Sequence, residues 1–210
     1  MGSAGRTDQT TLLDLPAVET PIALAIAYLL GSIDFGVIVP RLMGIDIYKH
    51  GSGNPGASNV MRTIGKKAGA AVMLGDAAKG TLAAFVGSWL VGDVIGFWCG
   101  LAAVAGHVFP VWHRFRGGRG VATAIGAVLW LEPWFGLVLA LGWAATVALT
   151  KTASLASLGA MVLYVPGYAI LGWRGWSLVA AGCTAALVIV RHAPNIRRLL
   201  GGREQTVETA

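Results

Sequence analysis

Charged side chains are scarce in this sequence. They make up 12% of its 210 residues, whereas a soluble globular protein carries roughly a quarter. Hydrophobic residues contribute 55%, and the mean hydropathy is +0.67. This composition excludes an ordinary soluble domain, and we predict an all-α integral membrane protein of one or at most two domains.

Cysteine and acidic residues are also few. Both cysteines, Cys99 and Cys183, lie within apolar runs, so we expect small packing residues and neither a disulfide scaffold nor a metal site. The sequence has no H-E-x-x-H motif, and Asp34, Asp46 and Asp76 are not spaced as ligands on one helix. We therefore predict that the protein has no metal site.

Basic residues outnumber acidic residues by 16 to 10. In an apolar chain, such an excess reports orientation in the membrane and contact with anionic headgroups. The predicted partners are therefore membrane lipids, and nucleic acid is not among them.

Seven apolar runs divide the chain. We predict a polar N-terminal tail at residues 1–19, a membrane domain at residues 20–204 and a frayed C-terminal tail at residues 205–210. The first of these segments lacks the pattern of a signal peptide. The apolar runs are residues 22–39, 68–91, 94–112, 121–131, 134–149, 153–171 and 175–190.

The run at residues 121–131 is short, and as a helix it covers only about half of the hydrocarbon thickness. If it crosses, there are seven transmembrane helices, with the N-terminus outside and the C-terminus cytoplasmic. The 16 basic residues then divide into 13 inside, 2 outside and Lys79 within a span. If it does not cross, the division becomes 9 to 6, so the positive-inside rule favours seven. An aromatic belt would then lie near the outer boundary, formed by Trp89, Trp130, Trp134, Trp173 and Trp176.

Two aspartates and one lysine fall within predicted spans. Asp34 interrupts the first run, and two interpretations are equally open: a site residue, or an acid partnered to a neighbouring helix. Asp76 and Lys79 lie three residues apart on one helix face, where they can neutralise each other. For these two residues we expect a structural ion pair.

A polar, glycine-rich stretch separates the first two apolar runs. Its glycines let the backbone turn sharply and bring several N–H groups to one point, while short polar side chains and an arginine add donors. These residues are Gly51, Ser52, Gly53, Asn54, Gly56, Ser58, Asn59 and Arg62. Such a loop suits an anion such as phosphate, although an isolated stretch of this kind is more often an ordinary turn.

With seven spans, two further polar stretches, at residues 106–120 and 191–204, emerge on the same side of the membrane. The helix predicted from residue 153 adds Ser154 and Ser157, one turn apart, at that side. Together the stretches supply glycine turns, arginines, histidines and amides. We therefore predict a site for more than one phosphate at a membrane surface.

A protein nucleophile is missing from these stretches. There is no strand followed by G-x-S-x-G, and no cysteine lies near a histidine at the polar face. The chemistry would then rest on positioning two phosphorylated substrates and stabilising charge. Transfer between an activated acyl or phosphoryl donor and an alcohol fits this limit.

The polar stretches together resemble the bacterial acyl-phosphate:glycerol-3-phosphate acyltransferase family, the PlsY-type membrane enzymes. The resemblance covers about residues 24–204, in order. The matching segments are Gly31-Ser32-Ile33-x-Phe35-Gly36, Gly51-Ser52-Gly53-Asn54-x-Gly56-Ala57-Ser58-Asn59-Val60-x-Arg62, Asp76-x-x-Lys79-Gly80, Gly106-His107-x-Phe109-Pro110, Gly117-Gly118-Arg119-Gly120-Val121-Ala122-Thr123, Ser154-Leu155-Ala156-Ser157 and Arg191-His192-x-x-Asn195-Ile196-x-Arg198-Leu199.

This resemblance implies a seven-helix, multi-pass protein of the bacterial inner membrane with its active site facing the cytoplasm. It implies transfer of a fatty acyl group from acyl-phosphate to the 1-hydroxyl of glycerol 3-phosphate, which gives lysophosphatidic acid and phosphate in the first step of phospholipid synthesis. The family uses neither acyl-CoA nor acyl carrier protein directly. The resemblance implies no cofactor, metal or covalent acyl-enzyme. It does imply a functional link to an enzyme that forms acyl-phosphate.

The resemblance also assigns roles to matching positions. Catalytic roles fall to Ser154, His192 and Asn195, and Asn195 is the candidate to stabilise the developing oxyanion. Substrate binding falls to Ser52, Gly53, Asn54, Ser58, Arg62, His107, Gly117, Gly118 and Arg119. Among these, Gly117, Gly118 and Arg119 are expected to form a second phosphate cradle.

Four positions depart from the usual pattern of the family. Lys is common where Arg119 stands, Thr where Ser58 stands, Arg where Tyr48 stands and Pro where Asp34 stands. An arginine binds phosphate as a planar fork, so the geometry at position 119 changes while the charge is kept.

Three alternatives come from other classes: a transporter of a phosphorylated solute, a phosphatidyl-group transferase and a non-enzymatic lipid-binding scaffold. Against a transporter, the cations gather at one face and the two halves show no matching pair of interrupted helices. The multi-aspartate metal motif of a phosphatidyl-group transferase is absent. A lipid-binding scaffold would not need glycine turns that expose backbone donors.

Overall fold

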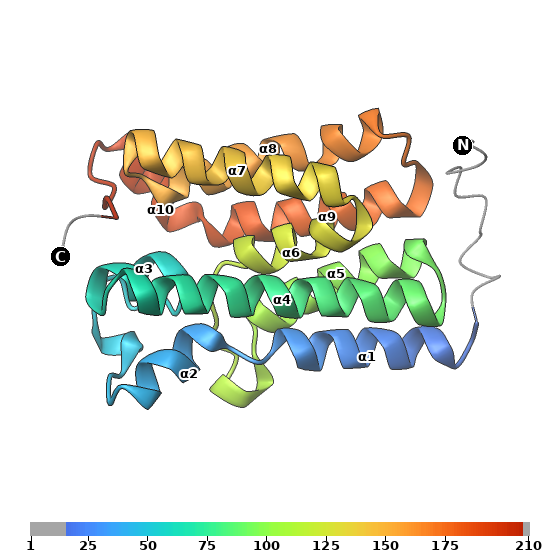
Figure 1. Ribbon diagram of the computed structural model, residues 1–210, viewed down its shortest axis with the longest axis horizontal. Coiled ribbons are helices and arrows are strands. Elements are labelled where there is room, and N and C mark those ends of the chain that lie inside the picture. The colour runs from blue at the N-terminus through green and yellow to red at the C-terminus, as the bar shows by residue number, and fades with distance from the viewer. Residues whose placement is uncertain (1–15, 208–210) are drawn as a thin grey trace.

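The computed structural model describes residues 16–207, and in this part of the chain all regular secondary structure is helical. Figure 1 shows the longer helices side by side along the longest axis of the molecule. These are α1 (Glu19–Gly31), α4 (Lys66–Leu90), α5 (Asp93–Val108), α6 (Val121–Leu131), α7 (Pro133–Thr150), α8 (Ala153–Ile170) and α9 (Gly175–Arg191). The predicted all-α fold is confirmed for the described residues.

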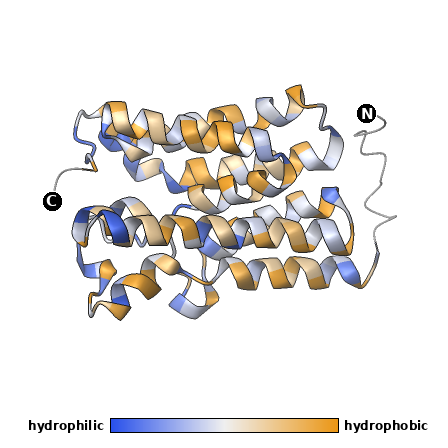
Figure 2. Cartoon of the chain, viewed as in Figure 1, coloured by the Kyte–Doolittle hydropathy of each residue, from blue (hydrophilic) through white to orange (hydrophobic). Residues whose placement is uncertain are grey.

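Shorter helices lie mainly at one end of the bundle. They are α2 (Phe35–Leu42), α3 (Ala57–Thr63), α10 (Ala193–Leu200) and the 3₁₀ turns Ile47–Lys49 and Val111–His113. In Figure 1, α3 and α10 lie at the left end, whereas α1 begins at the right end. Figure 2 shows strongly hydrophilic residues around α3, α10 and the adjoining loops, and mainly apolar residues along α1, α7 and α8.

Five stretches of the described chain are long and apolar enough to cross a membrane: Glu19–Leu42, Lys66–Leu90, Asp93–His113, Pro133–Thr150 and Ala153–Ile170. The pair α9 and α10, bent by 57° between them, makes a sixth when counted as one span. Helix α6 is apolar but has only 11 residues.

Close backbone contact holds α6 against α4. A Cβ on Gly80 of α4 would lie 2.0 Å from the Thr123 carbonyl oxygen, and one on Gly126 of α6 would lie 2.0 Å from that of Ala77. Small residues of this kind let membrane helices approach closely. This contact sets the position of the start of α6 and of Arg119, which precedes it.

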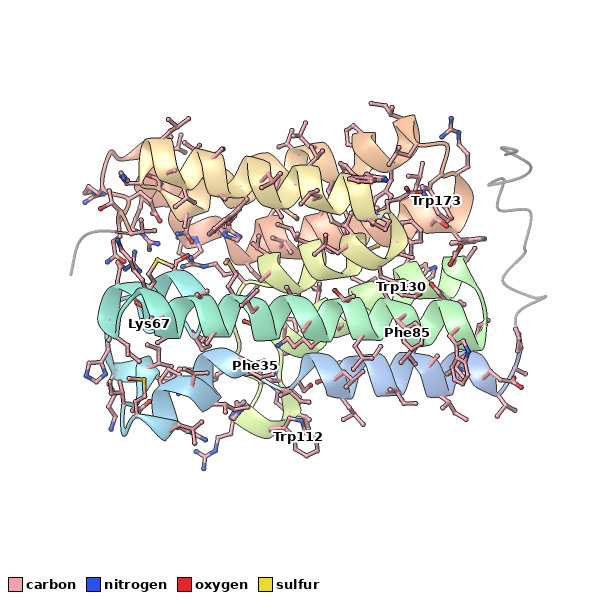
Figure 3. The ribbon with its side chains drawn as sticks, in the orientation of Figure 1. Phe35, Lys67, Phe85, Trp112, Trp130 and Trp173 are labelled. Carbon is pink, nitrogen blue, oxygen red and sulfur yellow. The ribbon has the colours of Figure 1, made fainter. Side chains whose placement is uncertain are left out.

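Aromatic residues fill the opposite end of the bundle. The ring centroids of Phe97 and Tyr168 lie 4.7 Å apart, and those of Phe97 and Trp173 lie 4.8 Å apart, in edge-to-face arrangements. In Figure 3, Trp130 and Trp173 lie toward the end at which α1 begins, while Lys67 lies toward the end with α3. The two ends of the bundle therefore differ, one being aromatic and the other basic.

A capped break separates α1 from α2. The Asp34 side chain, fully buried, accepts a hydrogen bond of 3.0 Å from the Gly36 N–H and so caps α2. The interruption predicted in the first run is therefore present, and Asp34 has a defined structural role in it.

The two cysteines have different surroundings. Cys99 is buried, and a Cβ on Gly87 would lie 2.7 Å from its sulfur, so Cys99 is the small packing residue that was predicted. Cys183 is exposed on α9, so the prediction of a packing role is wrong for that residue.

The termini of the described chain differ from the predicted tails. Most of the predicted tail at 1–19 lies outside the described residues, and α1 begins at Glu19. Residues 205–207 were expected to be frayed, but the Val207 N–H donates to the Lys151 carbonyl at 2.8 Å, and the Thr206 carbonyl accepts from Arg62 at 3.3 Å. These hydrogen bonds hold the segment after α10 against the end of the bundle.

Candidate active site

Asn59 organises the first glycine loop. Its side-chain oxygen accepts a hydrogen bond of 2.9 Å from the Ser52 N–H, and its Nδ2 donates to the His50 carbonyl at 3.0 Å. Gly51 has a φ of +57°, and a Cβ there would lie 2.2 Å from the Asn59 oxygen. The loop therefore needs glycine at position 51 in order to close on Asn59.

The second glycine loop is built differently from the prediction. The N–H of Gly117 donates to the Val108 carbonyl at 3.2 Å, and that of Gly118 donates to the His107 carbonyl at 3.1 Å. Both groups are thus committed to the end of α5, and the expected cradle is not formed by these two N–H groups. A Cβ on Gly117 would lie 1.9 Å from the His107 carbonyl oxygen, so here glycine permits close packing of the loop on α5.

Glu204 joins three residues of the polar end. Its Oε1 accepts hydrogen bonds from Ser154 at 3.0 Å and from Asn195 at 2.5 Å, and its Oε2 accepts from Arg198 Nε at 2.8 Å. Burial opposes ionisation of Glu204, but these hydrogen bonds outweigh it and lower the pKa of the carboxyl group below its ordinary value. The C-terminal segment thus places a carboxylate among the residues predicted to be catalytic.

Two further atoms of the predicted catalytic residues differ in their hydrogen bonding. His192, 2% exposed, has Nδ1 at 2.8 Å from the Val188 carbonyl; because a carbonyl only accepts, the proton is assigned to Nδ1. The side-chain oxygen of Asn195 is buried and has no hydrogen-bond partner among the described residues. It is therefore a candidate acceptor for a ligand.

Two arginines of the polar end are partly removed from water. Burial, followed by the nearby charge of Arg198, lowers the pKa of Arg119 to about 10, while Glu204 opposes the shift. Burial also lowers the pKa of Arg62. With its pKa at about 10, Arg119 stays protonated at neutral pH. Crowded, partly desolvated cations of this kind favour an anionic ligand.

One cavity of about 280 Å³ joins these groups to an apolar region. Its polar end is lined by Ser52, Asn54, Ser58, Asn59, Arg62, Arg119, Ser154, Ser157, His192, Asn195, Arg198 and Glu204. Its apolar arm runs between α4, α6 and α7 and is lined by Met73, Leu74, Ala77, Val121, Ala122, Ile125, Leu129, Ala140, Trp143 and Ala144. Leu74 is 67% exposed, so the arm reaches the outer surface of the bundle.

Nine of the predicted site residues therefore line a single cavity. They are Ser52, Asn54, Ser58, Arg62, His107, Arg119, Ser154, His192 and Asn195. Within the described chain, Gly53, Gly117 and Gly118 are not among its lining residues. Gly53 has a φ of +67° and donates its N–H to the His50 carbonyl at 3.0 Å, so it shapes the loop.

A buried ionic cluster lies at the inner edge of the cavity. Lys79 Nζ is 2.9 Å from Asp76 Oδ1, as the predicted ion pair requires. Asp34, Asp76 and His107 also converge, with ligand-type atoms within 4.8 Å of one another. The acidic residues are not spaced as ligands on one helix, but the fold brings Asp34, before α2, together with Asp76 of α4, which the sequence analysis did not predict. The Lys79 ammonium group, in contact with Asp76 and His107, supplies a positive charge to this cluster of residues.

Sequence reasoning counted Asn59 only among the donors of the glycine-rich stretch and assigned no role to Glu204. Asn59 sits in the glycine-rich stretch, but an amide that ties a loop looks the same in sequence as one that binds a ligand. Glu204 follows α10 at a distance set by the Gly201-Gly202 turn, in which Gly202 has a φ of +63°. The pair of glycines was the available signal that the chain turns back there.

The fold and the cavity together define an integral membrane protein with a cavity that is lined by arginines and polar groups at one end and by apolar side chains at the other. A family model described as glycerol-3-phosphate acyltransferase matches residues 21–202. The chain belongs to the glycerol-3-phosphate acyltransferase family, the PlsY-type family that its polar stretches resemble.

Individual relatives agree with this assignment. The chain is 43% identical over 198 residues to a glycerol-3-phosphate acyltransferase of Ralstonia pickettii strain 12J, covering 91% of this chain and 96% of that one. It is 44% identical over 183 residues to that of Pseudomonas aeruginosa strain LESB58, covering 86% and 95%.

The fold also matches solved structures. A crystal structure of PlsY (YgiH), an integral membrane glycerol 3-phosphate acyltransferase, in its glycerol 3-phosphate form superposes with a TM-score of 0.85. It is 39% identical and covers 89% of this chain and 94% of that one. The lysophosphatidic acid form gives a TM-score of 0.83 at the same identity, covering 90% and 96%.

Proposed function

We propose that this protein transfers a fatty acyl group from acyl-phosphate to the 1-hydroxyl of glycerol 3-phosphate. The products are lysophosphatidic acid and inorganic phosphate, in the first step of phospholipid synthesis. Membership of the family supports the acceptor and the reaction class, since relatives are named for them. An enzyme that forms acyl-phosphate would have to supply the donor.

The observation that carries this proposal is the continuity of the cavity. Arginines and short polar donors line one end, and apolar side chains from α4, α6 and α7 line the other. A fatty acyl-phosphate has the same division, with a charged head and an apolar chain. The arm would bury the chain while the arginines bind the head.

Two cationic regions could hold the two phosphates. Arg62 with Ser52 and Ser58 comes from the first glycine loop and α3, and Arg119 comes from the loop before α6. Arg198, paired with Glu204, is close enough to act electrostatically on both Arg62 and Arg119. The substrate whose KM rises when a cation of one region is removed would identify the phosphate bound in that region.

The proposed reaction needs no protein nucleophile. The oxygen of the glycerol 3-phosphate hydroxyl forms a bond to the acyl carbonyl carbon, and the bond from that carbon to the phosphate oxygen breaks. The hydroxyl proton passes to a phosphate oxygen, and inorganic phosphate leaves. Asn195 would stabilise the developing oxyanion through the second N–H of its side-chain amide, since the first is donated to Glu204. Ser154, whose only hydroxyl proton is donated to Glu204, would line the reacting centre.

We further propose seven membrane spans in a bacterial inner membrane, with the N-terminus outside and the C-terminus and the site at the cytoplasmic side. Support comes from α1 starting at one end of the bundle and α10 lying at the other, which requires an odd number of crossings (Figure 1). Helix α6 would be the short crossing. Lys67 at the end with α3 and Trp130 and Trp173 toward the opposite end fit the positive-inside rule and an aromatic belt (Figure 3).

The test is an assay of the purified protein in detergent with acyl-phosphate and glycerol 3-phosphate. We expect phosphate release that requires both substrates, and formation of the 1-acyl product. Release from acyl-phosphate alone would mean hydrolysis and would contradict the proposal. Uptake of glycerol 3-phosphate into vesicles without release would indicate the transporter alternative instead.

A further inference from the structure

The Lys79 ammonium group has three N–H donors, and three acceptors surround it. Its Nζ lies 2.7 Å from the Ile33 carbonyl oxygen, 2.9 Å from Asp76 Oδ1 and 2.9 Å from His107 Nδ1. The side chains of Lys79, Asp76 and His107 are all buried, between 2% and 5% exposed. An ammonium group donates and never accepts, so the Ile33 carbonyl and His107 Nδ1 each accept one of its protons, while Asp76 Oδ1 lies at ion-pair distance.

This arrangement fixes the proton on the His107 ring. Because Nδ1 accepts from Lys79, the ring proton of the neutral imidazole must sit on Nε2. Asp76 Oδ1 lies 3.5 Å from Nδ1 and accepts a shorter contact from Lys79. If Lys79 were absent, the same aspartate would favour a proton on Nδ1 and would leave Nε2 as an acceptor.

Nε2 faces the second glycine loop at the cavity. A Cβ at Gly118 would lie 2.3 Å from Nε2, nearer than any other heavy atom. The missing side chain at Gly118 therefore leaves room for the Nε2 edge of the ring, and His107 is one of the residues that line the cavity. The N–H groups of Gly117 and Gly118 are already paired with α5, so the Nε2–H of His107, which belongs to α5, is a donor available beside this loop.

We propose that Lys79 is a positioning residue that sets the tautomer of His107, so that Nε2–H donates to a phosphoryl oxygen of a substrate. The proposal rests on the proposed function, which supplies the phosphate-bearing substrates. It assigns to the buried Asp76–Lys79 pair a task besides structural neutralisation. The carboxylate of Asp76 compensates the positive charge of Lys79 inside the bundle.

The tautomer is tested first, without substrates, on the full chain in detergent. The protein carries ¹⁵N-labelled histidine, and the His107 resonances among the 4 histidines are assigned by their loss in His107→Gln. We expect a protonated Nε2 and an unprotonated Nδ1 in the wild type, and the reverse in Lys79→Met. A proton on Nδ1 in the wild type, or an unchanged tautomer in folded Lys79→Met, would overturn the proposal.

Kinetics give the second readout. In Lys79→Met we expect KM for one of the two substrates to rise about ten- to hundredfold, with a smaller change in kcat, because one donor to a charged group is lost. The substrate whose KM rises identifies the phosphate that His107 contacts. An unchanged KM for both substrates would count against the proposal.

A variant pair that keeps Lys79 guards against misfolding of Lys79→Met. In His107→Gln, the side-chain amide can place an N–H where Nε2 stands, whereas in His107→Asn it reaches only the position of Nδ1. We expect the glutamine variant to retain a KM within about threefold of the wild type and the asparagine variant to show the full increase. Equal KM values in the two variants would overturn the proposal. Failure of the wild type to turn over would contradict the proposed function and leave the tautomer measurement standing by itself.

Discussion

The side-chain amide of Asn195 donates a hydrogen bond of 2.5 Å to the Glu204 carboxylate, which also accepts from Ser154 and Arg198. Three groups from α8 and α10 are thereby held by one residue of the C-terminal segment. The orientation of the Asn195 amide follows, because a carboxylate cannot donate. The side-chain oxygen of Asn195 then points away from Glu204, and it has no hydrogen-bond partner among the described residues.

Replacement of Glu204 by Gln tests this positioning. A neutral amide accepts more weakly than a carboxylate, and it loses the ion pair with Arg198, so Asn195 and Ser154 are held less firmly. We expect kcat to fall about ten- to hundredfold while the protein remains folded. Glu19→Gln, in the first turn of α1 at the other end, is the matched control. Tighter glycerol 3-phosphate binding in Glu204→Gln would show that the carboxylate competes with substrate, contrary to this prediction.

The same carboxylate should make stability depend on pH. The folded pKa of Glu204 lies below its ordinary value of 4.5, so ionised Glu204 stabilises the folded state above that pH. The contribution disappears as the pH falls from 4.5 through the lower folded value. Thermal unfolding of wild type and Glu204→Gln in detergent should therefore differ at pH 7 and converge in the acid range. A difference that grows on acidification would mean that the folded pKa is raised instead.

Arg62 should be required for activity because its guanidinium is one of the cations of the cavity. Its contacts with the Thr206 carbonyl and Asn59, at 3.3 and 3.4 Å, are long, which leaves the fork available to a phosphate. We expect Arg62→Ala to lower kcat/KM about 100-fold or more, and Arg62→Lys to recover part of the loss. Arg197→Ala removes an exposed cation of α10 that does not line the cavity, and it should leave kcat/KM within about twofold. Equal losses in the two alanine variants would point to general electrostatics.

The apolar arm should control acyl-chain length. Ala140 of α7 lines it, and Ala140→Phe would fill part of it. We expect the activity with a 16-carbon acyl-phosphate to fall about tenfold more than that with an 8-carbon donor, since about 0.8 kcal/mol is lost for each CH₂ group left unburied. The neighbouring Leu141, 60% exposed and outside the lining, gives the control Leu141→Phe. A uniform loss over both chain lengths would place the chain elsewhere.

The seven-span topology can be checked by cysteine labelling in intact cells. The exposed Cys183 is first replaced by Ala, and single cysteines are then introduced at the exposed Arg174 and Arg203. With an odd number of crossings and the C-terminus inside, a membrane-impermeant maleimide should label position 174 in intact cells and position 203 only after permeabilisation. Labelling of both positions from one side would contradict the proposed topology.

Much of the site could be predicted from sequence because its donors come in short local motifs. Arg62, Arg119, Ser154, His192 and Asn195 each lie in a polar stretch at the end of an apolar run, and ends on the same side of a membrane must meet. The Asp76–Lys79 pair was predictable for a similar reason, since residues three apart share one face of a helix.

The roles of the glycines were not predictable in the same way. The sequence analysis predicted that the N–H groups of Gly117 and Gly118 would donate to a phosphate. In the structure these N–H groups donate to carbonyls of α5, and the missing side chains make room for His107. A glycine in sequence states only that a side chain is absent. Whether the space serves a ligand, a turn or a neighbouring helix depends on what the fold brings there.

The sequence by itself determined that this chain is a helical membrane protein of a known acyltransferase family, because hydropathy and local motifs need no long-range information. Only the tertiary structure decided that Asp34 and Asp76 meet around Lys79, that Glu204 returns to hold Asn195, and that an apolar arm continues the polar site. Those outcomes depend on how α4, α5, α6 and α10 pack. Packing brings together residues that are far apart in the chain, and such contacts cannot be predicted from local sequence patterns.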